Sequence, residues 1–248
     1  MKYVIFGDIH SNWEALSTFL QVVDNEPDIA LICLGDVVGY SASPNECLKA
    51  LYDRHIPILM GNHERALLRA VERETFNDVA RTALEWQKRH IDPIYLKLIA
   101  NLPYMIQYKS FSVSHANFHQ PTRFTYITSE EKALPSLEAL QTRIGFFGHT
   151  HLPAIFWQDE EGYRNPKMEM LHGARNTITI EEGFRYLVNP GSLGQPRDGD
   201  PRASFVVLND EERTITLHRF SYDCSAEFER IRQAELPKIL GERLFVGF

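Results

Sequence analysis

Near its start the chain reads Lys2-Tyr-Val-Ile-Phe-Gly-Asp-Ile-His-Ser11, and this stretch decides the fold. Tyr3 to Phe6 are the apolar residues of a short buried strand, which the following glycine ends. Asp8 and His10 come directly after its carboxyl end. A carboxylate and an imidazole two residues apart at the end of a strand are half of a metal site, so the other half is sought at the ends of later strands.

Two further units of strand and helix follow the first one. We expect the first helix from Asn12 to Val23, with Ser11 as its cap and Glu14 completing a capping box. The next two strands are Asp28–Leu34, ending in Gly35-Asp36, and Ile56–Met60, ending in Gly61-Asn62-His63-Glu64. Successive units of this kind predict parallel strands joined by right-handed crossovers. Ligands collect at the carboxyl edge of such a sheet.

The later part of the chain changes character. Residues 64–101 carry helical patterns in two or three pieces, and short strands dominate from residue 143 to residue 220. A hairpin over residues 104–114 runs into His115, and a strand over residues 143–147 runs into Gly148-His149-Thr150-His151. No Gly/Ser/Pro-rich linker divides the chain. We therefore expect one domain over residues 1–248, of the α/β class.

Three smaller features complete the expected secondary structure. The capping-box pattern Thr128–Glu131 predicts a helix that Pro135 interrupts. The stretch from Asp159 to Lys167 is rich in charge and predicts a loop that faces solvent. A helix from Ser225 to Gln233 is the last predicted element.

The composition limits the function classes. The hydrophobic fraction of 44% is ordinary for a globular protein, and the net charge of −7 argues against general nucleic-acid binding. Cys33, Cys47 and Cys224 are odd in number and follow no CxxC spacing, which indicates a reducing compartment, so we expect a cytoplasmic protein. The longest apolar runs have only the length of a strand, so we expect no membrane span.

The candidate ligands gather at the predicted strand ends. Five of the ten histidines lie there beside two aspartates and an asparagine, and the set is Asp8, His10, Asp36, Asn62, His63, His115, His149 and His151. Each residue alone has an ordinary explanation as a turn, cap or surface residue. Together, mixed Asp, Asn and His ligands suit Mn, Fe, Zn, Co or Ni better than Mg or Ca. Even seven of these eight as ligands are too many for one tetrahedral ion and suit two ions that share a carboxylate.

The spacing of two ligand pairs predicts where their side chains point. His149 and His151 are separated by one residue, as are Asp8 and His10. In an extended segment, side chains with this spacing lie on the same face. We therefore expect the two members of each pair to point the same way.

These motifs resemble the five signature blocks of the calcineurin-like metallophosphoesterases. The blocks are present in family order as Asp8-Ile-His10, Gly35-Asp36, Gly61-Asn62-His63-Glu64, His115 and Gly148-His149-Thr150-His151. Asn189-Pro190-Gly191-Ser192 resembles a further block of the small bacterial and archaeal phosphodiesterase-like branch. The resemblance implies a four-layer sandwich of two mixed β-sheets flanked by helices, with a two-metal site at one edge.

The resemblance also implies a role for each candidate residue. By the family pattern, one metal is held by Asp8, His10, Asp36 and His151, and the other by Asp36, Asn62, His115 and His149. Asp36 would then bridge two divalent ions, with Mn favoured. Attack by a hydroxide shared between the ions would break the phosphate ester. His63 lies beside a ligand, is not a ligand in the family, and is placed to protonate the leaving oxygen.

One departure from the family concerns the substrate phosphate. The protein serine/threonine phosphatases carry an Asp-Arg pair a few residues after the bridging aspartate, and here Gly39 and Tyr40 stand in those places. The missing arginine would bind phosphate and the missing aspartate would orient the catalytic histidine. Arg197 and Arg202 are candidates for the lost phosphate contact. The alternative is a polar turn with two surface arginines.

The leading hypothesis is therefore a cytoplasmic, two-metal phosphohydrolase that cleaves a phosphodiester or a small phosphorylated metabolite. A phosphomonoesterase or protein phosphatase is the alternative among enzymes. From another class, a non-catalytic interaction module on the same fold is possible, as in the retromer subunit that resembles this family and lacks the catalytic histidine. His63 and every ligand position are intact here, which favours the enzyme.

Overall fold

The computed structural model describes residues 1–162 and 165–248. Its strands are β1 (Lys2–Phe6), β2 (Ile29–Cys33), β3 (Met105–Gln107), β4 (Phe111–Ser114), β5 (Ile144–Phe146), β6 (Ala154–Asp159), β7 (Lys167–Met170), β8 (Arg175–Thr179), β9 (Phe184–Asn189), β10 (Ala203–Asn209) and β11 (Thr214–Phe220). Its helices are α1 (Trp13–Val23), α2 (Pro44–Asp53), α3 (Asn62–Leu68), α4 (Ala70–Arg73), α5 (Asp78–His90), α6 (Pro93–Ile99), α7 (Glu130–Ala139), α8 (Cys224–Gln233) and α9 (Ile239–Glu242), with 3-10 turns η1 (Pro121–Arg123) and η2 (Arg243–Phe245).

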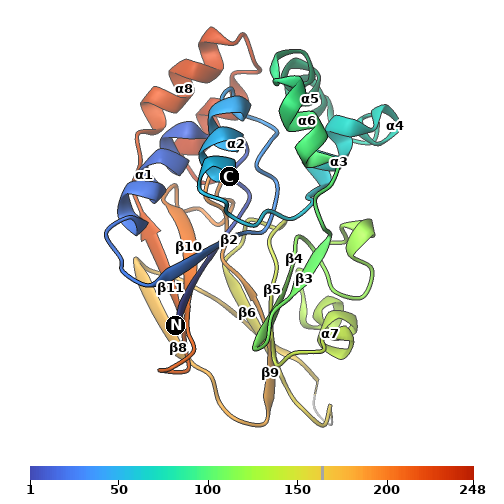
Figure 1. The fold of residues 1–248 in the computed structure, drawn as a ribbon, viewed down its shortest axis with the longest axis vertical. Coiled ribbons are helices and arrows are strands. Elements are labelled where there is room, and N and C mark those ends of the chain that lie inside the picture. Colours follow the sequence, from blue (N-terminus) through green and yellow to red (C-terminus); the bar gives the residue numbers. More distant parts are fainter. Residues whose placement is uncertain (163–164) are drawn as a thin grey trace.

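The strands form two mixed sheets (Figure 1). The five-stranded sheet has the order β2-β1-β10-β11-β8, in which β1 is parallel to β2 and antiparallel to β10. The six-stranded sheet has the order β3-β4-β5-β9-β6-β7, in which β4, β5 and β9 are parallel. The expected class and the two mixed sheets flanked by helices are confirmed.

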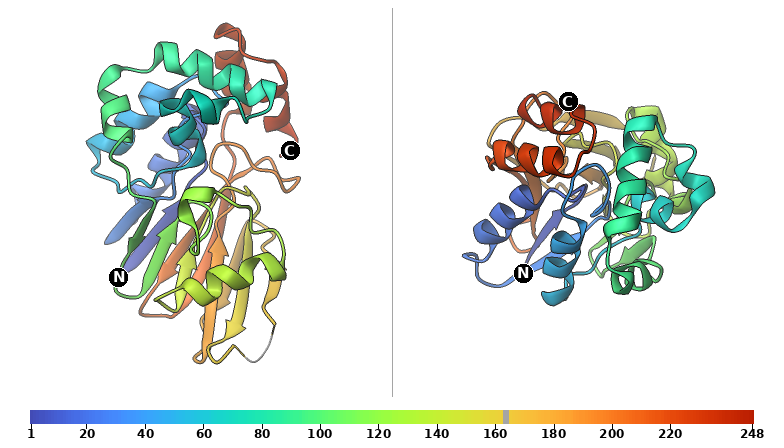
Figure 2. Two further views of the ribbon diagram at one scale, coloured as in Figure 1. Left: turned by 90° about the vertical axis from the view of Figure 1, so that its right-hand side faces the viewer. Right: turned by 90° about the horizontal axis from the view of Figure 1, so that it is seen from above.

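Apolar side chains between the layers hold the sandwich together. Strand β1 illustrates this, because side chains alternate between the faces of a strand. Ile5 joins the core between the two sheets with Phe111 and Phe146 of the other sheet. Val4 and Phe6 point the opposite way, into the core beneath α1 and α2. On the far side, α7 covers the six-stranded sheet, as the left view of Figure 2 shows.

The start of α1 differs from the prediction. Asn12, and not Ser11, caps the helix, because its Oδ1 accepts a hydrogen bond of 3.0 Å from the backbone N–H of Ala15. Ser11 has a left-handed backbone, with φ of 57°, and its N–H donates to the carbonyl of Val37. Glu14 forms an ion pair with Arg230 of α8 in place of the expected capping box.

Four other predicted elements need correction. Residues 56–60 do not form a third strand but make a single parallel bridge, between Cys33 and Ile58. The helical region after residue 61 contains α3, α4, α5 and α6, which is more pieces than expected. Helix α7 continues through Pro135, which lies inside it, instead of being interrupted there. Helix α8 is not the last element, since α9 and η2 follow. The predicted loop from Asp159 to Lys167 includes residues 163 and 164, which lie outside the described residues.

The topology brings several loops to one edge of the sheets. The carboxyl ends of β1, β2, β4 and β5 lie below the helices in Figure 1. Backbone hydrogen bonds join the loops there, since the N–H of Asp8 donates to Gly35 and that of Gly148 donates to His115. Within residues 1–162 and 165–248, no helix is both long and apolar enough to cross a membrane.

Candidate metal centre

The predicted ligands lie in the loops that follow the strands. Asp8 and His10 follow β1, Asp36 follows β2, His115 follows β4, and His149 and His151 follow β5, while Asn62 and His63 begin α3. All but Asn62 are buried, and none of these buried residues is more than 5% exposed. The structure therefore brings all eight predicted residues to one buried edge.

The backbone of this edge is unusual. Five of the predicted ligands have a positive φ, namely Asp8, His10, Asp36, His149 and His151. This conformation is uncommon outside glycine and persists where the surrounding structure enforces it. The expectation of an extended segment after β5 is therefore wrong. His149 and His151 do not share one direction, because they belong to two different groups of side chains.

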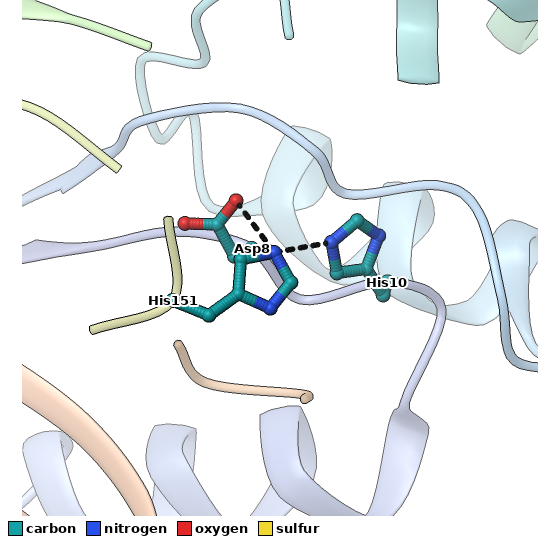
Figure 3. A group of neighbouring side chains, drawn as sticks. All are labelled: Asp8, His10 and His151. Carbon is teal, nitrogen blue, oxygen red and sulfur yellow. Dashed lines mark hydrogen bonds and ion pairs between the residues drawn. The ribbon is translucent and has the colours of Figure 1, made fainter. Parts of the chain in front are cut away.

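The first group consists of Asp8, His10 and His151 (Figure 3). The Nε2 atom of His151 lies 3.4 Å from Oδ1 of Asp8 and 3.1 Å from Nε2 of His10. Nδ1 of His10 lies 3.0 Å from the carbonyl of Val38, and Nδ1 of His151 lies 2.6 Å from that of Gln195. A carbonyl only accepts, so both Nδ1 atoms carry hydrogen.

The protonation of this group makes it a fitting metal site. Burial lowers the pKa of both His10 and His151, which favours their neutral forms. Each neutral ring that donates from Nδ1 presents a lone pair at Nε2. Two such lone pairs face each other here beside a carboxylate, and a shared cation would satisfy all three. The residues therefore fit a divalent ion.

The second group consists of Asp36, His115 and His149, with Asn62 beside it. Nδ1 of His115 donates to the carbonyl of Leu34, and its Nε2 lies 3.1 Å from Oδ1 of Asn62 and 3.4 Å from Oδ2 of Asp36. Burial lowers the pKa of His149 to about 3, so this ring is neutral. Its Nε2 is buried and has no hydrogen-bond partner among the described residues. An orphaned ring nitrogen in a group with the Asp36 carboxylate again fits a cation.

Asp36 lies between the two groups. Its Oδ2 is 3.8 Å from Nε2 of His10 and 3.4 Å from Nε2 of His115. Burial acts to raise its pKa, but the neighbouring His115 and His63 hold the pKa of Asp36 well below its usual value. The side chain is therefore an ionised carboxylate in contact with both groups.

Glu64 holds the Asp36 loop against α3, a role that the sequence did not indicate. Its buried carboxylate accepts backbone hydrogen bonds of 2.7–3.1 Å from Asp36, Val37, Val38 and Gly61. A Cβ at position 61 would overlap Oδ1 of Asp36, so the approach requires glycine. Two ligand-bearing segments, which are far apart in sequence, are thereby fixed to each other.

The His63 side chain is positioned mainly by packing against neighbouring aromatic and imidazole rings. Its ring centroid lies 4.7 Å from those of His10 and Tyr40 and 4.9 Å from that of Phe76. Its Nδ1 is buried, and no described residue bonds to it. Burial lowers the pKa of His63 to about 4. A Cβ at position 39 would overlap this Nδ1, so Gly39 makes room for the ring where the phosphatase branch has an aspartate.

A cleft of about 540 Å³ opens over the two groups. Its lining includes Asp36, His63 and Arg197. Nη2 of Arg197 donates to Oε1 of Gln195 at 3.0 Å and to the Tyr40 hydroxyl at 3.3 Å. Its Nε is buried and lacks a partner within the described part of the chain. The Arg197 guanidinium therefore has donor capacity left at the cleft.

Arg202 lies in a different environment. Its guanidinium binds both carboxylate oxygens of Asp200, at 2.5–3.2 Å. Arg202 does not line the cleft, whereas Arg197 does. The two predicted arginines are thus separated: one faces the candidate centre, and the other has its charge paired.

Two residues near the centre were not predicted. The Tyr126 ring stacks on His149 at a centroid distance of 4.0 Å. Gln87 of α5 accepts from the N–H of Gly39 and donates to the Ser11 hydroxyl and the Ser41 carbonyl. Gln87 is fully buried. A buried polar residue on an otherwise apolar helix face was the available signal for Gln87, while the loop around Tyr126 has no periodic pattern.

Known proteins provide an independent comparison. The family model described as the calcineurin-like phosphoesterase superfamily domain matches residues 1–213. The chain is 36% identical over 250 residues to the uncharacterized protein MJ0912 of Methanocaldococcus jannaschii, and the match covers 98% of this chain and 97% of that protein.

Two crystal structures have a similar fold. A metallophosphoesterase from Sphaerobacter thermophilus matches with a TM-score of 0.86 and 31% identity, over 100% of this chain and 99% of that chain. The hypothetical protein PH1004 from Pyrococcus horikoshii OT3 matches with a TM-score of 0.79 and 14% identity, over 100% and 98% of the chains. The second likeness concerns the fold alone.

Proposed function

Because this chain belongs to the calcineurin-like phosphoesterase superfamily, we propose that it is a two-metal hydrolase of phosphodiesters or small phosphorylated metabolites. The family implies divalent metal ions, and the two side-chain groups are suited to hold them. The observation that carries the proposal is the position of Asp36, whose Oδ2 faces His10 on one side and His115 on the other. One carboxylate in contact with two ligand groups supports two neighbouring ions.

The proposed ligand sets follow the two groups. Asp8, His10, Asp36 and His151 would hold one ion, and Asp36, Asn62, His115 and His149 would hold the other. We favour Mn, because nitrogen and oxygen ligands are mixed in both sets, although Fe, Zn, Co and Ni share this preference. When bound, a metal pair polarises a phosphoryl group and lowers the pKa of water. The three free cysteines are consistent with a reducing, cytoplasmic setting.

Protein side chains supply the other functions of the proposed reaction. His63 would donate a proton to the leaving oxygen as the ester bond breaks. Arg197 would bind phosphoryl oxygens through its free donors, since guanidinium groups bind phosphate strongly. The arginine in the cleft also favours a second candidate, a phosphomonoesterase, because a monoester carries an extra negative charge that Arg197 would neutralise.

Metal content and turnover test the proposal together. We expect protein purified without chelator, then loaded with Mn, to bind two ions per chain and to hydrolyse bis-nitrophenyl phosphate. Asp36→Asn should lose more activity and more metal than Asp8→Asn, because Asp36 belongs to both proposed ligand sets and Asp8 to one. One ion per chain without contact to Asp36 in anomalous scattering would overturn the two-metal site. A tenfold preference for nitrophenyl phosphate in kcat/KM would favour the monoesterase.

A further inference from the structure

The cleft is larger than a single phosphoryl group needs. A volume of about 540 Å³ lies in the range of pockets that hold a whole small ligand. Beyond the predicted ligands, its lining includes residues 75–77 and residues 123–126. The second of these segments belongs to a loop over residues 117–128, between β4 and α7. This wall of the cleft is available to a part of the substrate that is not hydrolysed.

The loop over residues 117–128 is firmly built. Asn117 is fully buried, and its side chain accepts from the N–H of Gln120 at 2.8 Å and donates to the Thr125 hydroxyl at 3.0 Å. Phe124 is 8% exposed, packs in a core cluster with Met60, and has a φ of 51°. An anchored aromatic residue in a left-handed conformation indicates that the surrounding structure enforces this backbone.

Both sequence neighbours of Arg123, which are Thr122 and Phe124, are in contact with Arg65. Arg65 of α3 donates to the carbonyl of Thr122, and its guanidinium lies 4.4 Å from the centroid of the Phe124 ring. Arg123 therefore stands between two residues that are both fixed. Its own side chain is exposed and lines the cleft. The loop thus presents one arginine from a rigid backbone.

The charge of Arg123 is not neutralised by the protein. Arg65 forms an ion pair with Glu72, so its charge is compensated. The Arg123 side chain has no ion pair or hydrogen bond within residues 1–162 and 165–248. Arg197 forms no ion pair within the described residues, and its guanidinium donates to the neutral groups of Tyr40 and Gln195. A chain with a net charge of −7 thus leaves two guanidinium groups uncompensated in its cleft.

We infer that Arg123 forms a second anion subsite, which binds a phosphate group of the substrate other than the one that is hydrolysed. The inference rests on the proposed function, because the phosphoryl group that is hydrolysed would bind at the proposed metal centre. It names the substrate class as a phosphodiester that carries an additional phosphate group. A guanidinium recognises phosphate through paired hydrogen bonds, and a fixed backbone reduces the entropy lost on binding.

Calorimetric titration of two nucleotides into the Mn-loaded protein tests the subsite directly. The probes are thymidine 5′-monophosphate and thymidine 3′,5′-bisphosphate, which differ by one phosphate group. We expect the bisphosphate to bind the wild type at least tenfold more tightly. Arg123→Gln should reduce this advantage to less than twofold. Arg89→Gln, at an exposed arginine of α5 outside the cleft, is the matched control and should keep the full advantage.

Two outcomes would overturn the inference. One is equal binding of both nucleotides by the wild type, and the other is a bisphosphate advantage that survives in Arg123→Gln. Turnover of the 5′-nitrophenyl esters of the same nucleotides separates the two proposals. A binding advantage that depends on Arg123, without turnover of either ester, would refute the proposed function and support the subsite. Turnover of both esters with equal kcat/KM, and with no binding advantage, would refute the subsite alone.

Discussion

The His63 ring is surrounded by the rings of His10, Tyr40 and Phe76, and these contacts fix its position without fixing its proton. The phosphatase branch of the family has an aspartate at the place of Gly39, where it would orient this histidine. Here steric fit replaces that hydrogen bond, because the missing Cβ of Gly39 leaves room for Nδ1 of His63. Burial lowers the pKa of His63 to about 4, so a proton on this ring at neutral pH requires the negative charge of a bound substrate.

The proton-donor role of His63 predicts a dependence on the leaving group. His63→Ala should slow hydrolysis of an alkyl diester by roughly 10²–10⁴, because the departing alkoxide is basic. A nitrophenyl diester should slow far less, since nitrophenolate is already a stable anion. The measurement is kcat for both substrates, with metal content as the control. Equal slowing of both would point to a positional role, and loss of metal would assign His63 to the scaffold of the centre.

The sequence predicted some residues of the candidate site and missed others. The eight residues at the strand ends were predictable, because the carboxyl ends of parallel strands meet at one edge and the residue types suit a metal. Tyr126 and Arg123 were not, because they lie in a loop whose conformation depends on the buried Asn117 and Phe124. The separate directions of His149 and His151 depend on left-handed backbone angles, which a spacing of two does not encode.

At the scale of elements, β11 anchors the loop that carries Arg197. Arg219 of β11 forms a buried ion pair with Asp198, and the two side chains are 1% and 4% exposed. Arg219 also lies 3.7 Å from Asp200, the partner of Arg202. Asp198 directly follows Arg197. The position of the cleft arginine therefore depends on an ion pair beneath it.

Removal of Arg219 should be costly. Arg219→Met leaves the Asp198 carboxylate buried without its partner, which predicts a loss of about 3–5 kcal/mol in the free energy of unfolding by urea. Arg213→Met is the matched control, because its pair with Glu182 is 45% and 78% exposed and should contribute less than about 1 kcal/mol. A loss in Arg219→Met no greater than that of the control would contradict an anchoring role.

Strands and helices were predictable to different degrees. The later strands were found because runs of β-branched and aromatic residues alternate between turn signals. The prediction of a third strand was wrong. Residues Ile56 to Met60 are apolar and mostly buried, as in a strand, but they make only one bridge to β2. The cap of α1 is Asn12 and not the predicted Ser11. The reason is that the loop over Asp8 to Ser11 is held by hydrogen bonds to residues 35–37, which are distant in sequence.

At the scale of the whole molecule, α1 and α8, which come from near the two ends of the sequence, pack together. Helix α8 lies along α1, as Figure 1 shows, and Arg230 forms an ion pair with Glu14. Beside this pair, Glu227 is fully buried, and its Oε2 lies 3.4 Å from the backbone N–H of Glu14. Its Oε1 has no hydrogen-bond partner among the described residues. A half-satisfied carboxyl group at this junction couples the stability of the fold to pH.

Glu227→Gln should therefore stabilise the protein at alkaline pH. Burial raises the pKa of Glu227 to about 7, from 4.5 for an ordinary glutamate. The native state thus holds this proton more tightly than the unfolded chain, so the stabilisation is fully present below pH 4.5 and is lost as the pH rises through 7. The pKa difference corresponds to about 3 kcal/mol. Glutamine stays neutral, so the variant avoids this loss.

The difference in the free energy of unfolding between the wild type and Glu227→Gln reports the titration of Glu227 alone, because all other titrating residues are shared. In urea unfolding, the two should differ by less than about 1 kcal/mol at pH 5, because Glu227 keeps its proton in the native wild type there. At pH 8 the variant should be more stable, by up to about 3 kcal/mol. A constant difference across this range would mean that Glu227 is ionised in the native state throughout. Ionisation would then require a compensating charge, and Arg230, which lies in the adjacent ion pair with Glu14, is the nearest candidate.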